Sequence, residues 1–125
     1  EFLGITYIQG TKYLIGSNGK TIIEKNHNYQ NNLPLIFGDF LPENYIDILN
    51  KLKNNEFNFK SVSEFYYYKN ERWDLILKNN IKIKLPNVNV DSALKIAKLY
   101  IDHTNHEKKI IDLRVANQVI ISNEQ

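Results

Sequence analysis

The chain has 125 residues, of which 16 are basic and 14 acidic, and it contains neither cysteine nor methionine. A chain of this length suits one domain, which buries roughly two thirds of the surface that its unfolded form exposes. The formal charge of +2 argues against a dedicated nucleic-acid binder, and the lack of cysteine excludes disulfides and cysteine-based metal sites. Without an initiating methionine, the chain is expected to be an excised or processed piece of a longer protein.

The first third predicts a short β meander that is followed by an extended apolar run. The strands are expected at Ile5–Gln9, Tyr13–Gly16 and Thr21–Glu24. Asn18-Gly19 between two of them is a strong hairpin signal, because both residues tolerate positive φ. Pro34 holds the apolar run Leu33–Gly38 extended.

A helix is predicted next, starting at Pro42 and ending at Asn54-Asn55. Its apolar stripe has helical spacing and consists of Tyr45, Ile48, Leu49 and Leu52. Alternation then predicts a loose strand over Phe57–Val62 and a further strand over Ser63–Tyr68.

The clearest pattern in the chain is a β-hairpin with one buried and one mostly polar face. Alternating apolar residues mark its two arms, Trp73–Lys78 and Ile81–Leu85, and Asn79-Asn80 lies between them. Asparagine accepts the left-handed conformation better than most residues, so a tight turn is expected there.

The last third predicts a helix and two strands. Asn89 or Asp91 can cap the helix, and its buried stripe consists of Val90, Ala93, Leu94, Ala97 and Ile101. Strands are expected at Ile110–Val115 and Gln118–Ser122, with a bend at Ala116-Asn117. Residues 1–125 are therefore interpreted as a single α+β domain: a mainly antiparallel curved β-sheet with two helices packed on one face.

Candidate catalytic and ligand sites are weak. Gly16–Thr21 resembles part of a phosphate-binding loop, but Leu14 replaces the first glycine, and strand-like residues follow where a helix is required. A hairpin turn is the favoured interpretation. His103 and His106 with Asp102 could suggest a metal site, yet zinc needs three or four ligands, so a solvated helix end is favoured.

No nucleophile motif is recognisable, so no catalytic residue and no cofactor are predicted, although a hydrolase with acids from distant segments stays open as a minor alternative. The aromatics of Phe65–Tyr68, followed by Trp73, are interpreted first as the core of a sheet, because aromatic residues favour strands. A periplasmic glycan- or peptide-binding module that uses these rings is kept as the second hypothesis. Consecutive strand residues point to opposite faces, so at most half of these rings can line one surface.

A strand at the end of a domain offers a different function. Val119-Ile120-Ile121 is a strong β former close to the end of the chain. If it lies at a sheet edge, its unpaired backbone groups can receive a strand from a partner protein.

Three segments contain short motifs of a known family, in the family's order along the chain. The first is Leu33-Pro34-x-Ile36-x-Gly38, the second is the hairpin from Arg72-Trp73-Asp74-Leu75 to Leu85-Pro86, and the third is Ile111-Asp112-Leu113-Arg114. Together they resemble the FtsQ/DivIB family of bacterial cell division proteins, in which the hairpin is the signature and usually has glycine where this chain has Asn80. The resemblance covers essentially the whole chain.

The resemblance implies the non-catalytic β domain of a single-pass inner-membrane protein, located in the periplasm at the division septum. A cytoplasmic tail, a membrane helix and a POTRA domain are expected upstream. The implied partners are FtsB/FtsL-type (DivIC/FtsL) proteins, bound by strand addition at the last strand with help from the neighbouring helix end. Carried over to this sequence, the implied partner-binding residues are Val115, Ala116, Asn117, Gln118, Val119, Ile120, Ile121 and Ser122, and also Arg72, Leu99 and Tyr100.

Overall fold

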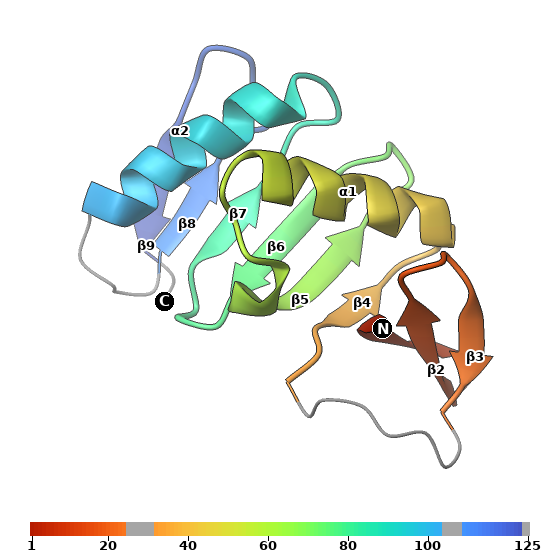
Figure 1. Ribbon diagram of the computed structural model, residues 1–125. Coiled ribbons are helices and arrows are strands. Elements are labelled where there is room, and N and C mark those ends of the chain that lie inside the picture. Colours follow the sequence, from red (N-terminus) through yellow and green to blue (C-terminus); the bar gives the residue numbers. More distant parts are fainter. Residues whose placement is uncertain (25–31, 104–108, 124–125) are drawn as a thin grey trace.

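The computed structural model describes residues 1–24, 32–103 and 109–123. Its strands form one sheet of nine strands in the order β3-β2-β1-β4-β5-β6-β7-β8-β9, so that β3 and β9 are the two edges (Figure 1). The elements are β1 Phe2–Ile8, β2 Thr11–Gly16, β3 Thr21–Ile23, β4 Leu35–Phe37, α1 Pro42–Asn54, η1 Phe59–Ser61, β5 Val62–Tyr67, β6 Trp73–Leu77, β7 Lys82–Lys84, α2 Val90–His103, β8 Lys109–Asp112 and β9 Ile120–Asn123.

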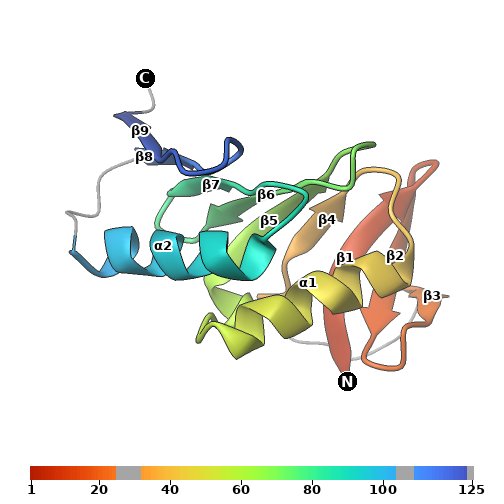
Figure 2. The same ribbon diagram turned by 90° about the horizontal axis from the view of Figure 1, so that it is seen from above.

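The predicted α+β class is confirmed. The described sheet is mostly antiparallel, and its parallel pairs are β1–β4, β4–β5 and β7–β8. In Figure 2 both helices lie on the same side of the sheet. The other side is here called the open face, and it carries Tyr66, Asp74, Lys84 and Asp112 in register on neighbouring strands.

A single row of side chains crosses all nine strands on the helix side of the sheet. The pairing register makes the row Ile23, Tyr13, Thr6, Ile36, Phe65, Leu75, Ile83, Ile111 and Ile121, from β3 to β9. Its central members are buried, whereas Ile23 at one end is 52% exposed and Ile121 at the other is 38% exposed. The hydrophobic core therefore extends to both edges of the sheet and is uncovered there.

Aromatic side chains fix α1 onto this row. Tyr45 of α1 packs edge-to-face on Phe65 with 5.1 Å between ring centroids, and Trp73 packs on the same pair. Burial raises the pKa of the Tyr45 phenol, which donates a hydrogen bond to the Leu3 carbonyl at 2.7 Å. The predicted buried stripe of this helix is confirmed for Tyr45, Ile48 and Leu52.

Three hairpin loops share one design. In each loop, the N–H of the first of five residues donates a hydrogen bond to the carbonyl of the fifth. The fourth residue has a left-handed backbone conformation: Gly19 (φ 78°), Glu71 (φ 66°) and Asn80 (φ 69°). This is the three-residue loop with a left-handed third position. The predicted turns at Asn18-Gly19 and Asn79-Asn80 are confirmed, although only the second residue of each pair has positive φ.

One predicted strand is wrong, and one extended run contains a strand that the sequence did not predict. Residues 57–61 do not form a strand, because the Phe57 N–H closes the end of α1 on the Leu52 carbonyl and the Asn58 side chain caps the 3-10 turn Phe59–Ser61. The extended run around Pro34 contains the strand β4, which lies between β1 and β5. Its partners are parallel and distant in sequence, so local alternation carries no signal for it.

The final two strands are also shifted. β8 ends at Asp112 rather than Val115, and β9 begins at Ile120 rather than Gln118. The chain turns between them, with Asn117 at φ 62° and a bond from the Gln118 N–H to the Val115 carbonyl at 3.1 Å. The predicted bend at Ala116-Asn117 is confirmed.

Glu71 provides a test of the shared loop design. Replacing Glu71 by glycine removes the cost of a left-handed side-chain-bearing residue, so Glu71→Gly is expected to raise the free energy of unfolding by about 1 kcal/mol. Urea denaturation followed by far-UV circular dichroism measures this. Lys69→Gly, at a position of the same loop without positive φ, is the control and is expected to stabilise nothing. Equal effects of the two changes would contradict the loop assignment.

Candidate functional site

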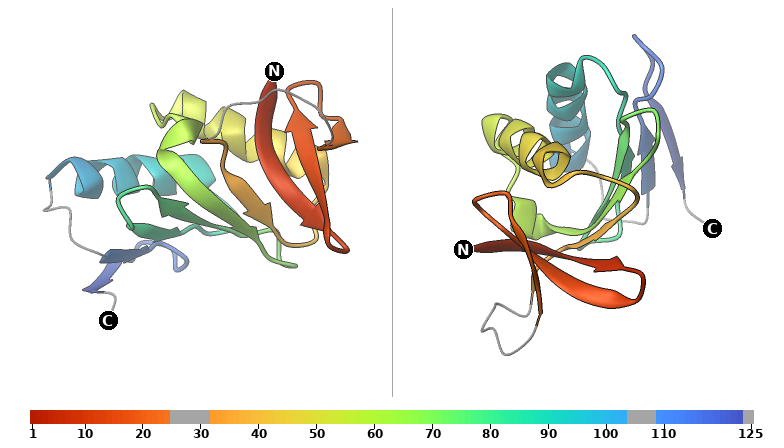
Figure 3. Two further views of the ribbon diagram at one scale, coloured as in Figure 1. Left: turned by 90° about the horizontal axis from the view of Figure 1, so that it is seen from below. Right: turned by 90° about the vertical axis from the view of Figure 1, so that its right-hand side faces the viewer.

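The outermost strand, β9, is the most exposed element of the sheet. All four of its residues, Ile120–Asn123, are exposed, and Ile120 is 51% exposed. β9 pairs with β8 on one side, and no other described strand pairs with its second side. In both views of Figure 3 it lies at the margin of the molecule. β9 therefore has the features of an edge strand that is open to addition.

The direction of the β8 backbone groups follows from one hydrogen bond. The Leu113 N–H donates to the Lys84 carbonyl of β7 at 2.9 Å. Because backbone groups of alternate strand residues point to opposite sides, Ile110 and Asp112 direct theirs away from β7 and toward β9.

The same alternation decides which groups of β9 are free to pair. Ser122 and Ile120 are the register partners of Ile110 and Asp112, so their backbone groups point at β8. The N–H and C=O groups of Ile121 and Asn123 consequently point outward from the sheet. The side chain of Ile121 lies on the helix side, as the last member of the row that crosses the sheet.

A groove of about 520 Å³ lies between the start of α2 and the turn that joins β8 to β9. Its walls come from the loop before α2, from α2 itself and from the turn, and they include Val88, Ile96, Leu113, Val115 and Val119. Val88 and Val115 are more than half exposed. A groove lined by both apolar and polar residues thus adjoins β9, because Val119 directly precedes that strand.

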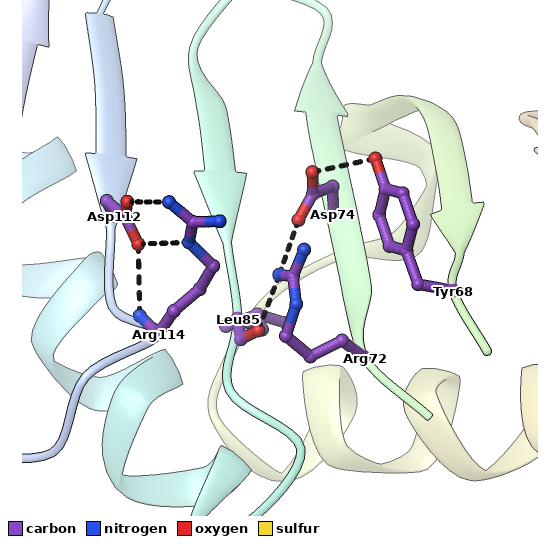
Figure 4. Close-up of polar contacts among 6 residues, drawn as sticks. All are labelled: Tyr68, Arg72, Asp74, Leu85, Asp112 and Arg114. Carbon is purple, nitrogen blue, oxygen red and sulfur yellow. Dashed lines mark hydrogen bonds and ion pairs between the residues drawn. The ribbon is translucent and has the colours of Figure 1, made fainter. Parts of the chain in front are cut away.

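A buried ion pair lies on the open face, separated from β9 by the strands β7 and β8 (Figure 4). The Arg72 guanidinium contacts the Asp74 carboxylate at 2.8 Å, and their side chains are only 13% and 3% exposed. Arg72 also donates to the Leu85 carbonyl, and the Tyr68 hydroxyl donates to Asp74 at 3.1 Å. The hydrogen bonds of Arg72 and Asp74 therefore connect the end of β5, β6 and the end of β7.

A second ion pair lies nearer the edge. Arg114 donates two side-chain bonds to the Asp112 carboxylate, at 2.9 and 2.7 Å, and its backbone N–H adds a third (Figure 4). The hydrogen bonds from Arg114 lower the pKa of Asp112. The pair therefore contributes stability above the usual carboxyl pKa, and this contribution is lost as the pH falls through the lowered value.

The structure separates the residues that the sequence assigned to partner binding. Ile120, Ile121 and Ser122 lie on β9, whereas Val115–Val119 form the turn and line the groove. Leu99 and Tyr100 are exposed on α2, and Arg72 is largely buried in its ion pair. Sequence reasoning missed Val88 and Ile96, which also line the groove. Two features of the sequence could have indicated them: Val88 is an apolar residue in a loop rich in proline and asparagine, and Ile96 is an apolar residue on the polar side of its helix.

The four consecutive aromatics divide between two faces, as alternation predicts. Phe65 and Tyr67 pack against Trp73 on the helix side, with Tyr67 4.7 Å from it between ring centroids. Tyr66 lies on the open face, where it stacks on Phe37 at 4.9 Å, and Tyr68 lies beside Asp74. Only half of the aromatics can therefore contribute to one surface.

The remaining motifs have simpler outcomes. Gly16–Lys20 is a hairpin loop that leads into β3, so the predicted turn is confirmed. A phosphate-binding loop would lead into a helix instead. His106 of the possible metal site lies outside the described residues. Among the residues that are described, no group of three or more metal-ligating side chains occurs, and no helix is long and apolar enough to cross a membrane.

Fold and site together define a mixed α+β sheet domain with an exposed terminal strand beside an apolar groove. The model of the family "Cell division protein FtsQ/DivIB, C-terminal" matches residues 6–114. The chain belongs to this family, a non-enzymatic scaffold family of cell division, and has a role in that process. The match ends at Arg114, so β9 lies beyond the matched residues. No curated protein matches the chain.

Removing Arg72 tests its structural role. Arg72→Ala leaves the Asp74 carboxylate buried without its partner, and it is expected to lower the free energy of unfolding by about 3 kcal/mol. Arg114→Ala is the matched control, because that side chain is 45% exposed and exposed pairs contribute little. Thermal and urea denaturation of both variants measure the difference. Equal losses in the two variants would contradict the role assigned to Arg72.

Proposed function

We propose that this chain is a docking module of the division machinery that receives an extended segment of an FtsB/FtsL-type (DivIC/FtsL) partner. The segment adds to β9 as a further strand during septum formation. The domain performs no catalysis and acts by linking division proteins. The observation that carries the proposal is the outward direction of the backbone groups of Ile121 and Asn123, on an edge with which no other described strand pairs.

The chemistry of the edge favours strand addition. Main-chain hydrogen bonds supply the affinity of an added strand, and alternate side-chain contacts supply its specificity. On the helix side, Ile121 ends an apolar row, so the partner residue opposite it is expected to be apolar. On the open face, the partner strand runs past Ile120, which lies beside Asp112.

The groove extends the same surface. A partner residue that flanks the added strand can enter the space between α2 and the β8–β9 turn, which Ile96, Val115 and Val119 line. Leu99 and Tyr100, which are exposed further along α2, add apolar area for a longer partner. These residues keep the partner-binding role that the family resemblance implies. Arg72 supports binding only indirectly, because its ion pair stabilises the fold.

The proposed cellular setting rests on the family resemblance. The parent protein is proposed to be a single-pass inner-membrane protein with a cytoplasmic tail, a membrane helix and a POTRA domain before this one. The present domain then lies in the periplasm at the division septum, and its sheet curves as one continuous β domain.

Proline at position 121 tests strand addition without breaking the sheet. Ile121→Pro removes an N–H that points outward, so the bonds between β9 and β8 remain. Binding of a peptide from the extracytoplasmic part of the same organism's FtsB-like protein is expected to weaken roughly tenfold or more, since one central bond is lost and the ring blocks its neighbour. Isothermal titration calorimetry measures this.

Ile121→Thr is the matched control, because it keeps the N–H and a β-branched side chain while it removes apolar area. It is expected to bind more tightly than the proline variant. Backbone amide NMR of the unchanged chain is expected to show shifts concentrated between Val115 and Asn123. Unchanged binding by Ile121→Pro, or shifts confined to other strands, would refute strand addition at β9.

A second candidate function has one supporting observation. Tyr66, stacked on Phe37, and Tyr68 present aromatic rings on the open face. Exposed rings on a sheet are a stacking surface for sugar rings, which makes a glycan-binding module the alternative.

The aromatic rings of the open face test this alternative. The double variant Tyr66→Ala/Tyr68→Ala is expected to lose retention on purified peptidoglycan in a pull-down if the alternative holds, because both stacking surfaces are removed. Tyr7→Ala, which removes an exposed tyrosine from β1, is the control. Retention that does not change in the double variant would eliminate the glycan-binding function and leave strand addition unaffected.

A further inference from the structure

Helix α2 takes part in the groove with one flank only. Ser92 and Ile96, which are about one helical turn apart, line the groove. The next stripe around the helix is buried in the core and consists of Ala93, Leu94 and Ala97. The position of this groove wall therefore depends on how α2 is seated on the sheet and on what holds its opposite flank.

The opposite flank of α2 is tied to the end of α1 by a hydrogen bond between two side chains, here called the clasp. The Asn55 amide nitrogen, at the C-cap of α1, donates to the Asp91 carboxylate at 2.8 Å and to the Lys51 carbonyl at 2.8 Å. Both hydrogens of this amide are therefore used. Asn55 is only 7% exposed, so without Asp91 one of its donors would lose its protein partner in a largely buried place.

A second contact repeats this tie further along α2. Lys98 lies on the same side of α2 as Asp91, because seven residues are nearly two full turns. The Lys98 ammonium donates to the Glu56 carbonyl at 3.2 Å and lies 5.2 Å from the centroid of the Phe57 ring. Glu56 and Phe57 directly follow Asn55, so the same short segment after α1 holds α2 at both points.

The buried stripe of α2 shows why such a tie matters. Helices resist rolling on a surface through large side chains that interdigitate with it. Of the buried residues in the stripe, Ala93 and Ala97 are small, and Leu94 is the large one. Packing alone therefore leaves α2 some freedom to roll about its axis, and a roll would carry Ile96 toward or away from the β8–β9 turn.

We infer that Asn55 and Asp91 position the groove, because their clasp holds α2 at the distance from the β8–β9 turn that the partner segment requires. This role rests on the proposed function, in which the groove is part of the partner surface. Neither residue lines the groove. Both are positioning residues that act through the placement of α2.

Asp91 has a second effect that the experiment must separate from the clasp. It lies in the first turn of α2, where a negative charge stabilises a helix through the helix dipole. Asp91→Asn removes this charge but keeps an oxygen that accepts the hydrogen bond from Asn55. Asp91→Ala removes both the charge and the acceptor.

Isothermal titration calorimetry with the FtsB-like peptide compares these variants, and circular dichroism shows that each is folded at the temperature used. Asp91→Ala is expected to weaken binding about fivefold, and Asp91→Asn to stay within about twofold of the unchanged chain. Asp102→Ala is the matched control, because it removes the same charge from an exposed position near the other end of α2. It is expected to leave binding unchanged.

A double-mutant cycle tests whether Asn55 and Asp91 act through one bond. Asn55→Ala is expected to weaken binding about as much as Asp91→Ala does. The double variant Asn55→Ala/Asp91→Ala is expected to bind little worse than either single variant, because each change already removes the clasp. Losses of binding free energy that simply add would contradict a shared bond and overturn the inference.

Backbone amide NMR of the free variants provides a readout that does not need the peptide. The turn Val115–Val119 forms the groove wall across from α2. Its amide signals are expected to shift in Asp91→Ala and to stay in place in Asp91→Asn and Asp102→Ala. A role of the clasp in stability alone would lower the free energy of unfolding and leave the signals of the turn unmoved.

Two results would overturn the inference. One is Asp91→Ala binding as tightly as Asp102→Ala with the signals of the turn in place. The other is an equal loss of binding in Asp91→Asn, which would assign the effect to the charge at the start of α2. If the unchanged chain does not bind the peptide, the proposed function fails instead, and the spectra of the free variants still decide whether the clasp positions the groove.

Discussion

The row of side chains that crosses all nine strands is the constraint on which the rest of the domain depends. Each member must lie on the helix side, so a slip of one residue in any of the strands β5 to β9 would turn its apolar side chain to the open face. Tyr45 and Trp73 cover the middle of the row, where Phe65 and Leu75 are fully buried. The helices do not cover its ends, and the row stops at exposed isoleucines. The same packing that specifies the register thus leaves an apolar side chain exposed at β9.

The open face is organised by a different interaction. In its central row, Asp74, Lys84 and Asp112 alternate in sign across neighbouring strands, and opposite charges in register stabilise a sheet. Arg72 is drawn into the protein because Asp74 is buried, and this pair joins the hairpin to the end of β7. Toward β9 the charges end, and Ile120 and Ser122 follow. The change from paired charges to uncharged residues marks the boundary between the scaffold and the candidate binding edge.

Much of this fold could be predicted from the sequence, because its strongest signals are local. The alternation in Trp73–Lys78 and Ile81–Leu85, the stripe of α1 and the Asn-rich turns all depend on residues that are neighbours along the chain. The parallel strand β4 could not be placed, because its partners β1 and β5 are distant in sequence. The strand expected at Phe57 does not form, because the Phe57 N–H donates a hydrogen bond to the Leu52 carbonyl at the end of α1. For the candidate site, the sequence indicated the segment that forms the turn and the edge strand, but the turn at Asn117 and the groove wall from α2 depend on tertiary contacts.

The position of β9 in the sheet has a consequence for how such a module can change over generations. β9 is held by one neighbour, contributes no fully buried side chain and lies outside the stretch that matches the family. Substitutions at Ile120 or Ser122 therefore cost the folded core little, whereas a change at Phe65 or Leu75 disrupts it. Under the proposed function, selection can alter what the edge binds while the framework stays fixed, so lineages that share this framework are free to diverge in the partner sequence.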